Sequence, residues 1–105
     1  DFIHVQDTVK INLHFLHSGK SGIFNAGTGQ ARSFTAIGEC LKAIEGSGEL
    51  KSIPFPEDLR GKYQEFTEAD TTQLREAGYQ EEFLSLEEGI RIYHGMLKEN
   101  GGFHL

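Results

Sequence analysis

Two segments of the chain carry apolar residues at intervals of three and four, the spacing that places them on one face of an α-helix. The first segment covers residues 8–18. It follows Asp7, a good N-cap, and Gly19 stands where a glycine commonly ends a helix. The second segment covers residues 34–45 and follows Ser33, which is another good N-cap. Each pattern therefore predicts an amphipathic helix that packs through its apolar face.

Two capping boxes predict two further helices. Asp70 and Gln73 have the spacing of a capping box, and Gly78 lies where the short helix that they open would end. Ser85 and Glu88 repeat this spacing and open a final helix. Its apolar face consists of Leu86, Ile90, Tyr93 and Leu97.

Three shorter stretches predict β-strands. Residues 2–5 alternate as a strand would, residues 23–26 run into a glycine turn, and residues 50–55 form a run interrupted by proline. A strand, a glycine turn and a capped helix form a βα unit, so we predict an α/β fold. In this fold, residues 23–26 are a late parallel strand of a sheet whose earlier strands lie outside the chain. The chain opens in a strand-like segment without an initiator Met, which we interpret as a cut inside a larger protein.

Composition limits the classes of function. A chain of 105 residues is long enough for one domain with a modest core. The net charge of −6 argues against nucleic-acid binding, which usually requires a basic face. Cys40 is the only cysteine, which excludes an intramolecular disulfide and is typical of a reducing compartment. No apolar run approaches the roughly 18 residues of a membrane span, so we expect no membrane partner.

Three features could carry chemistry but have simpler interpretations. The turn at residues 27–29 (GTG) resembles part of a dinucleotide-binding loop, but Arg32 stands where that loop has its third glycine. We interpret it as a turn that packs tightly against a neighbouring strand. His14 and His17 share a helix, yet no third ligand completes a metal site, so we expect solvated histidines. Cys40 has no local partner that would lower its pKa, so we expect a structural thiol.

Residues 57–69 show no clear period and predict a long loop, a kind of segment that is often functional. The loop gathers Arg60, Lys62 and Tyr63 within an acidic chain. Arginine and lysine bind phosphate, and tyrosine adds a hydroxyl beside a flat apolar ring. This combination is typical of a site for a phosphorylated or nucleotide-sugar ligand. A solvated basic turn with Tyr63 tucked into the core is the alternative.

The residues contain no recognisable catalytic constellation. The sequence has no Ser/His/Asp group with a nucleophile elbow, no zinc-ligand spacing and no phosphate-binding Walker loop. The chain by itself therefore indicates the binding part of a protein rather than its reacting part.

Three motifs resemble extended short-chain dehydrogenases/reductases that act on nucleotide sugars. They are residues 1–7 (DFIHVQD), residues 24–29 (FNAGTG) and residues 85–90 (SLEEGI), in the order and spacing of that superfamily. Residues 53–67 (IPFPEDLRGKYQEFT) and the segment that follows them resemble the ADP-L-glycero-D-manno-heptose 6-epimerase family in particular. Epimerases of UDP-sugars are similar at the first and last motifs but lack this middle stretch.

The resemblance implies a bacterial cytoplasmic enzyme that makes the heptose precursor of the lipopolysaccharide inner core. This family is NADP-dependent and inverts C6 of ADP-D-glycero-D-manno-heptose to give ADP-L-glycero-D-manno-heptose, and its members form homo-oligomers. The cofactor performs the redox step while the protein orients it. The family tyrosine that matches Tyr63 contacts the substrate, so the resemblance implies a substrate-binding role for Tyr63. Lys62 beside it is a second candidate.

The chain departs from the family in what it lacks. The nucleotide loop and the Tyr-x-x-x-Lys pair have no counterpart, because Thr67 and Leu97 stand four residues after the tyrosines Tyr63 and Tyr93. We therefore expect no catalytic and no cofactor-binding residue in this chain, with NADP bound by a missing N-terminal part.

The resemblance also implies a division of the chain. Residues 1–46 would be a late βαβα part on the Rossmann-like sheet, and residues 47–105 would belong to a smaller C-terminal substrate-binding lobe. Two alternatives stay open: a fragment of another nucleotide-sugar epimerase or dehydratase, and a non-catalytic ligand-binding module.

Overall fold

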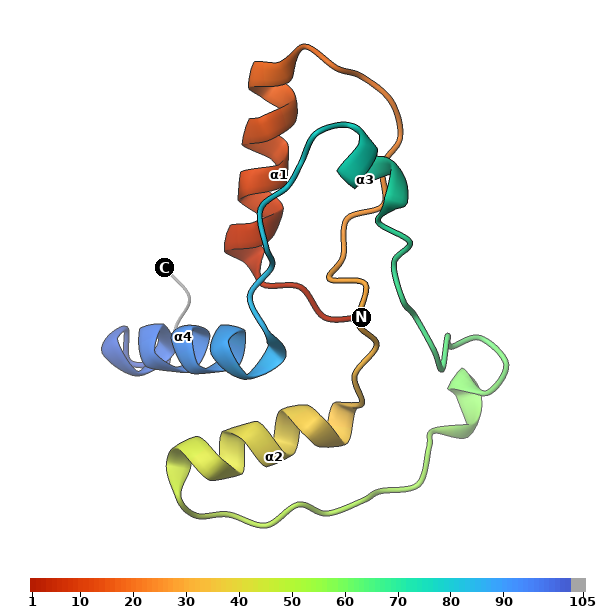
Figure 1. The fold of residues 1–105 in the computed structure, drawn as a ribbon. Coiled ribbons are helices and arrows are strands. Elements are labelled where there is room, and N and C mark those ends of the chain that lie inside the picture. Colours follow the sequence, from red (N-terminus) through yellow and green to blue (C-terminus); the bar gives the residue numbers. More distant parts are fainter. Residues whose placement is uncertain (103–105) are drawn as a thin grey trace.

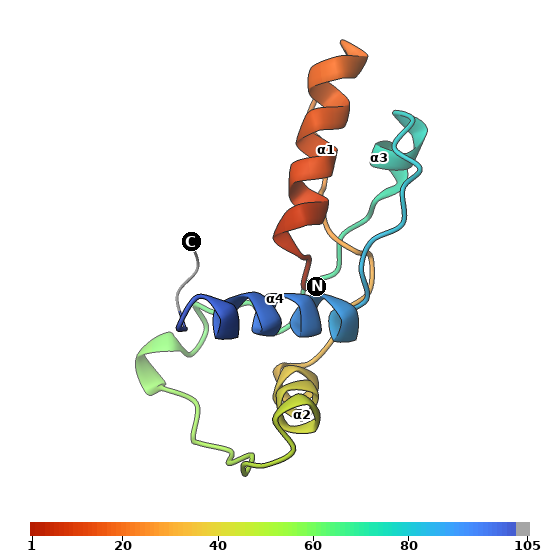
Figure 2. The ribbon, with the colours of Figure 1, turned by 90° about the vertical axis from the view of Figure 1, so that its left-hand side faces the viewer.

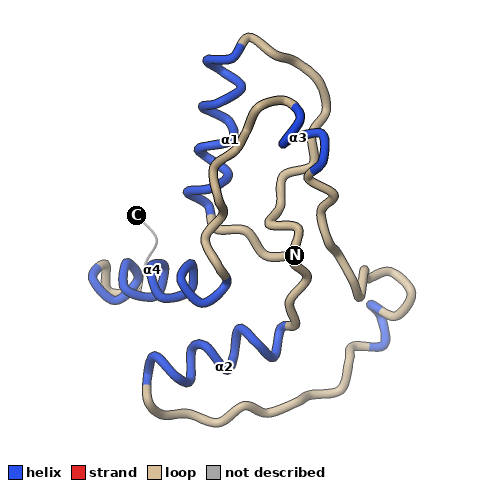
Figure 3. The backbone as a smooth tube through the Cα atoms, in the orientation of Figure 1, coloured by secondary structure: helices blue, strands red, loops and turns tan. Residues whose placement is uncertain are grey.

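The computed structural model describes residues 1–102, and within that range the chain forms helices joined by long loops (Figures 1 and 3). The helices lie in two groups, with α1 and α3 in one and α2 and α4 in the other (Figures 1 and 2). The elements are α1 (Val5–Ser18), α2 (Phe34–Glu45), the 3-10 helix η1 (Glu57–Leu59), α3 (Thr72–Glu76) and α4 (Leu86–Glu99). None of these helices is long and apolar enough to cross a membrane.

The predicted α/β fold is wrong, because residues 1–102 contain no β-strand and no sheet. Of the three predicted strands, residues 23–26 and 50–55 are loop, and residues 2–5 are loop up to Val5, where α1 begins. A strand exists only when the N–H and C=O groups of a neighbouring segment pair with its own. No such ladder joins these segments in the described chain, which is therefore not a Rossmann-like fragment with a late parallel strand.

The first helix starts earlier than its N-cap pattern predicts. His4 is the N-cap, and its Nδ1 accepts a hydrogen bond from the backbone N–H of Gln6 at 3.2 Å. Asp7, predicted as the cap, lies instead fully buried in the first turn, where its carboxylate accepts from the N–H of Leu84 at 2.9 Å. Gly19 ends the helix as predicted, in the left-handed conformation with φ of 69°.

The serine caps of the two longer later helices are confirmed. The Ser33 hydroxyl accepts from the N–H of Ala36 at 3.1 Å at the start of α2. Ser85 and Glu88 form the complete capping box of α4. The short helix α3 is also present, although Thr71 is its N-cap rather than Asp70.

Helices α2 and α4 pack side by side and are the pair of described helices whose backbones approach each other most closely (Figures 1 and 2). The carboxylate of Glu45 on α2 binds His94 and Lys98 on α4, with 3.2 Å to the lysine Nζ. These bonds lower the pKa of Glu45, with the His94 contact the largest cause. On α2, a Cβ added at Gly38 would lie 2.6 Å from a methyl carbon of Leu50, so this glycine marks a close packing contact.

The buried apolar core is small. It consists of Ile11 on α1, Leu74 on α3 and Tyr79 after α3. The guanidinium of Arg75 covers it from one side, 4.7 Å from the ring of Phe83, and donates to the carbonyl oxygen of Tyr79 at 2.9 Å. Burial, supported by the bond to Glu81, raises the pKa of Tyr79 to about 12.

The chain exposes far more surface than its mass predicts. Its accessible area is 8067 Å², whereas a folded monomer of this mass exposes about 5,900 Å². Its radius of gyration is 16.5 Å, against about 13 Å for a compact domain of similar length. Large apolar side chains contribute to the excess, such as Leu16 at 76% and Ile23 at 93% exposed. The described chain therefore leaves apolar surface uncovered.

We expect residues 1–105, expressed alone, to bind an apolar dye such as anilinonaphthalene sulfonate strongly, because dyes of this kind adsorb to uncovered apolar surface. The double variant Leu16→Gln, Ile23→Thr should bind less dye, since both side chains are exposed. Fluorescence titration measures the dye binding, and small-angle X-ray scattering measures the radius of gyration. A radius of gyration near 13 Å together with weak dye binding would contradict the open arrangement.

Candidate functional site

The carboxylate of Asp1 joins three distant parts of the chain. It accepts hydrogen bonds from the backbone N–H groups of Thr28 at 2.9 Å, Gly29 at 2.8 Å and Ala69 at 3.0 Å. The Thr28 hydroxyl adds a fourth bond at 2.7 Å. We call Asp1, Thr28, Gly29 and Ala69 the Asp1 hub. The hub brings the first resemblance motif, residues 1–7, against the glycine turn of the second.

The glycine turn packs closely against its neighbours, in keeping with a structural interpretation of this turn. A Cβ added at Gly27 would lie 2.6 Å from the Cβ of Ala69 and 2.9 Å from a carboxylate oxygen of Asp1. The neighbour is an extended loop segment rather than the strand that we predicted. Because Asp1 takes the N–H groups of Thr28 and Gly29, these donors are not available to cradle a phosphate.

Gly27→Ala should destabilise the chain by about 1–3 kcal/mol, because the added methyl group overlaps backbone-anchored atoms on two sides. Gly95→Ala is the matched control, since a Cβ at Gly95 in α4 meets nothing within 4 Å. In a helix, that change should stabilise by about 1 kcal/mol. Urea unfolding followed by circular dichroism measures the free energy of unfolding of both variants. Equal effects of the two substitutions would show that the hub does not limit stability.

Beside the Asp1 hub lies a hollow with a volume of about 700 Å³. Residues 31–34 at the start of α2 form one wall, residues 62–67 form another, and Asp1 and Phe2 complete the lining. We call this cavity the loop hollow. It contains both sequence-predicted site residues, Lys62 and Tyr63.

Tyr63 is exposed rather than tucked into the core. Its accessible fraction is 46%, and its ring centre lies 5.8 Å from that of Phe55. The preceding turn is closed by a hydrogen bond from the N–H of Lys62 to the carbonyl oxygen of Leu59 at 3.0 Å. Gly61 supports this turn with a φ of 72°. The loop therefore presents Tyr63 and Lys62 at the surface of the hollow.

Arg32 is a lining residue of the loop hollow that sequence reasoning missed. Its guanidinium binds the carboxylate of Glu87 through two bonds, at 2.5 and 3.2 Å. This hydrogen-bonded contact raises the pKa of Arg32 and holds that of Glu87 below its usual value. The only signal in the sequence was that Arg32 breaks the glycine pattern of a dinucleotide loop, which says nothing about a hollow formed with residues 62–67.

The remaining candidates lie away from the loop hollow, with His14 and His17 lining a separate hollow between α1 and residues 78–81. His14 is part-buried, with its ring centre 5.4 Å from that of Tyr79, and His17 is exposed and contacts the carbonyl oxygen of Leu13 at 2.7 Å. Cys40 is a half-buried free thiol on α2. Within residues 1–102, no three His, Cys, Asp or Glu side chains are placed to hold a metal ion.

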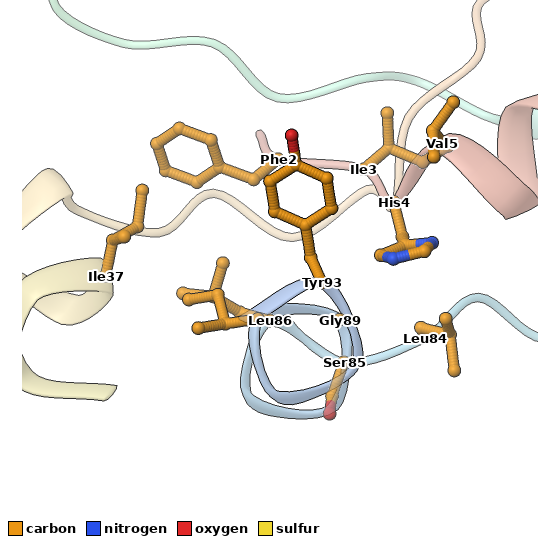
Figure 4. A pocket seen from close by; sticks show the side chains of 11 residues that line it. Phe2, Ile3, His4, Val5, Ile37, Leu84, Ser85, Leu86, Gly89 and Tyr93 are labelled. Carbon is orange, nitrogen blue, oxygen red and sulfur yellow. The ribbon is translucent and has the colours of Figure 1, made fainter. Parts of the chain in front are cut away.

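A second cavity is apolar and lies between residues 2–5 and α4. Figure 4 shows the ring of Tyr93 rising from α4 toward Phe2, while the ring of His4 approaches Gly89. The volume is about 360 Å³, and its lining contains no Lys, Arg, Asp or Glu. Nε2 of His4 is buried without a hydrogen-bond partner. This cavity does not offer the charges that a phosphorylated ligand requires, whereas the loop hollow does.

Comparison of the chain with models of known protein families finds no match. The residues of the loop hollow and the motifs of the sequence are therefore the features that indicate a function. Both concern the same loop, because residues 62–67, which form a wall of the hollow, are the last part of the segment 53–67 whose sequence resembles the epimerase family.

Proposed function

We propose that this chain is the substrate-binding part of an NADP-dependent epimerase that inverts C6 of ADP-D-glycero-D-manno-heptose. The product, ADP-L-glycero-D-manno-heptose, would serve the synthesis of the lipopolysaccharide inner core in the bacterial cytoplasm. The observation that carries the proposal is the exposed Tyr63 beside Lys62 at the loop hollow. Both residues belong to the stretch that resembles this family of epimerases.

The chemistry of the hollow suits a nucleotide sugar. A volume of about 700 Å³ lies within the range of small-molecule sites, about 300–1,000 Å³. The hydroxyl of Tyr63 can donate to or accept from a sugar hydroxyl, and the ammonium group of Lys62 can bind a phosphate oxygen as a point charge. Both groups bind and orient the ligand, and neither is placed to react with it.

The glycine turn of this chain does not offer its donors to NADP. The glycine turn that resembles a dinucleotide loop has its Thr28 and Gly29 N–H groups bound to Asp1. We propose that a part of the enzyme outside this chain binds the cofactor. The same proposal includes a homo-oligomeric enzyme, as in the family that the chain resembles. A non-catalytic ligand-binding module is the second candidate, favoured because the sequence has no recognisable catalytic constellation.

Tyr63→Phe should raise KM for ADP-D-glycero-D-manno-heptose about tenfold, because one hydrogen bond to the ligand is worth about 1.5 kcal/mol. The measurement is NMR of C6 inversion by the full-length natural protein that contains this chain, with NADP present. Tyr79→Phe is the matched control, since its hydroxyl bonds to Glu81 away from the hollow. That variant should keep KM unchanged.

The outcomes separate the candidates. An unchanged KM in Tyr63→Phe would keep the epimerase and remove the role of the hydroxyl. No inversion by a protein that binds NADP would indicate another nucleotide-sugar epimerase or dehydratase, and binding of UDP-sugars in preference to ADP-sugars would support that. A protein that binds the sugar nucleotide, does not bind NADP and does not convert the sugar nucleotide would be a ligand-binding module.

A further inference from the structure

Arg32 and Lys62 bring two cations to the loop hollow from segments that are far apart in sequence. The hollow also has two acidic residues, Asp1 and Glu65. The Asp1 carboxylate is already occupied by four donors of the Asp1 hub. Glu65 is therefore the one lining carboxylate without a role in the hub. Arg32 and Lys62 are the groups of the hollow that can attract an anionic ligand.

The contact of Arg32 with Glu87 shows what its guanidinium can recognise. Two of its N–H donors point at the two oxygens of one carboxylate, at 3.2 and 2.5 Å. A phosphate group offers oxygens in the same fork geometry and carries at least as much negative charge. The Arg32 guanidinium therefore has a pair of donors of the kind that phosphate recognition uses, and in this structure the pair is bound to Glu87.

Another anion can replace Glu87 at the Arg32 guanidinium with little loss of stability. The Arg32 side chain is 35% exposed and that of Glu87 is 54% exposed. Ion pairs with this much access to water contribute little to stability, because water solvates both charges nearly as well as they solvate each other. Glu87 is not among the residues that line the hollow, whereas Arg32 is. A ligand that takes the guanidinium from Glu87 therefore displaces no residue of the hollow's wall.

We infer that Arg32 is a diphosphate-binding residue of the loop hollow and that Glu87 holds its guanidinium while no anion is bound. The inference rests on the proposed function, since it assigns the diphosphate of the nucleotide sugar to Arg32. Tyr63 and Lys62 then contact the rest of the ligand. Glu87 acts as a competitor of the diphosphate rather than as a ligand contact.

The two partners of the ion pair should have opposite effects on anion binding. Arg32→Gln should weaken the binding of inorganic pyrophosphate about tenfold, since it removes a charge-assisted, bidentate contact. Glu87→Gln should tighten it about threefold, because the guanidinium no longer has to leave a carboxylate. Arg32→Lys should lie between Arg32→Gln and the natural protein, since lysine keeps the charge but loses the fork.

Isothermal titration of the full-length natural protein with pyrophosphate tests these effects. Arg91→Gln and Glu99→Gln on α4 are the charge-matched controls, because neither residue lines the hollow. Both controls should leave the affinity unchanged. Thermal melting of each variant checks that it is folded.

A purely structural ion pair would give a different pattern. Arg32→Gln and Glu87→Gln would then lower the melting temperature alike and change pyrophosphate affinity in the same direction, which would overturn the inference. Unchanged affinity in Arg32→Gln would overturn it as well. If the protein inverts ADP-heptose with an unchanged KM in Arg32→Gln, the inference fails and the proposed function stands. If pyrophosphate binding depends on Arg32 but no sugar nucleotide binds, the proposed function fails and the anion site stands.

Discussion

Four hydrogen bonds that converge on the carboxylate of Asp1 hold together a chain that has little apolar core. Three residues form that core, and all lie in the group of α1 and α3. The Asp1 hub lies elsewhere and ties the glycine turn to Ala69 at the end of the long loop. Two further contacts support it: the N–H of Ala31 donates to the carboxylate of Glu68 at 3.0 Å, and the amino group of Asp1 donates to the carbonyl oxygen of Thr67 at 2.7 Å. Together these bonds hold residues 62–67 beside residues 31–34 and give the loop hollow its shape.

The parts of the fold that the sequence predicts correctly depend on local bonds. Ser33 caps α2 through Ala36, three residues away, and Ser85 caps α4 through Glu88. The strands were predicted wrongly because a strand depends on a partner at a distance, and a run such as residues 23–26 carries no information on whether one exists. Asp7 failed as a cap for the same reason, since its partner Leu84 lies 77 positions further along the chain.

The candidate site also has one part that the sequence predicts and another part that it does not. Lys62 and Tyr63 could be selected from the sequence because they lie together in one basic loop, and the structure brings both to the loop hollow. Arg32 could not, because its relation to that loop arises only through the folding of residues 31–34 against residues 62–67. The division into residues 1–46 and 47–105 stays a prediction. The substrate-binding roles of Tyr63 and Lys62 also remain to be measured.

The bond between Asp7 and Leu84 has a consequence for the order of events during synthesis. Helix α1 is synthesised before residue 84, so the buried carboxylate in its first turn has no backbone donor until that later residue has been made. The Asp1 hub likewise cannot be completed until Ala69 has been made. Contacts of such long sequence separation form late and slowly. Most of this chain must therefore be synthesised before its first residues can be held in place.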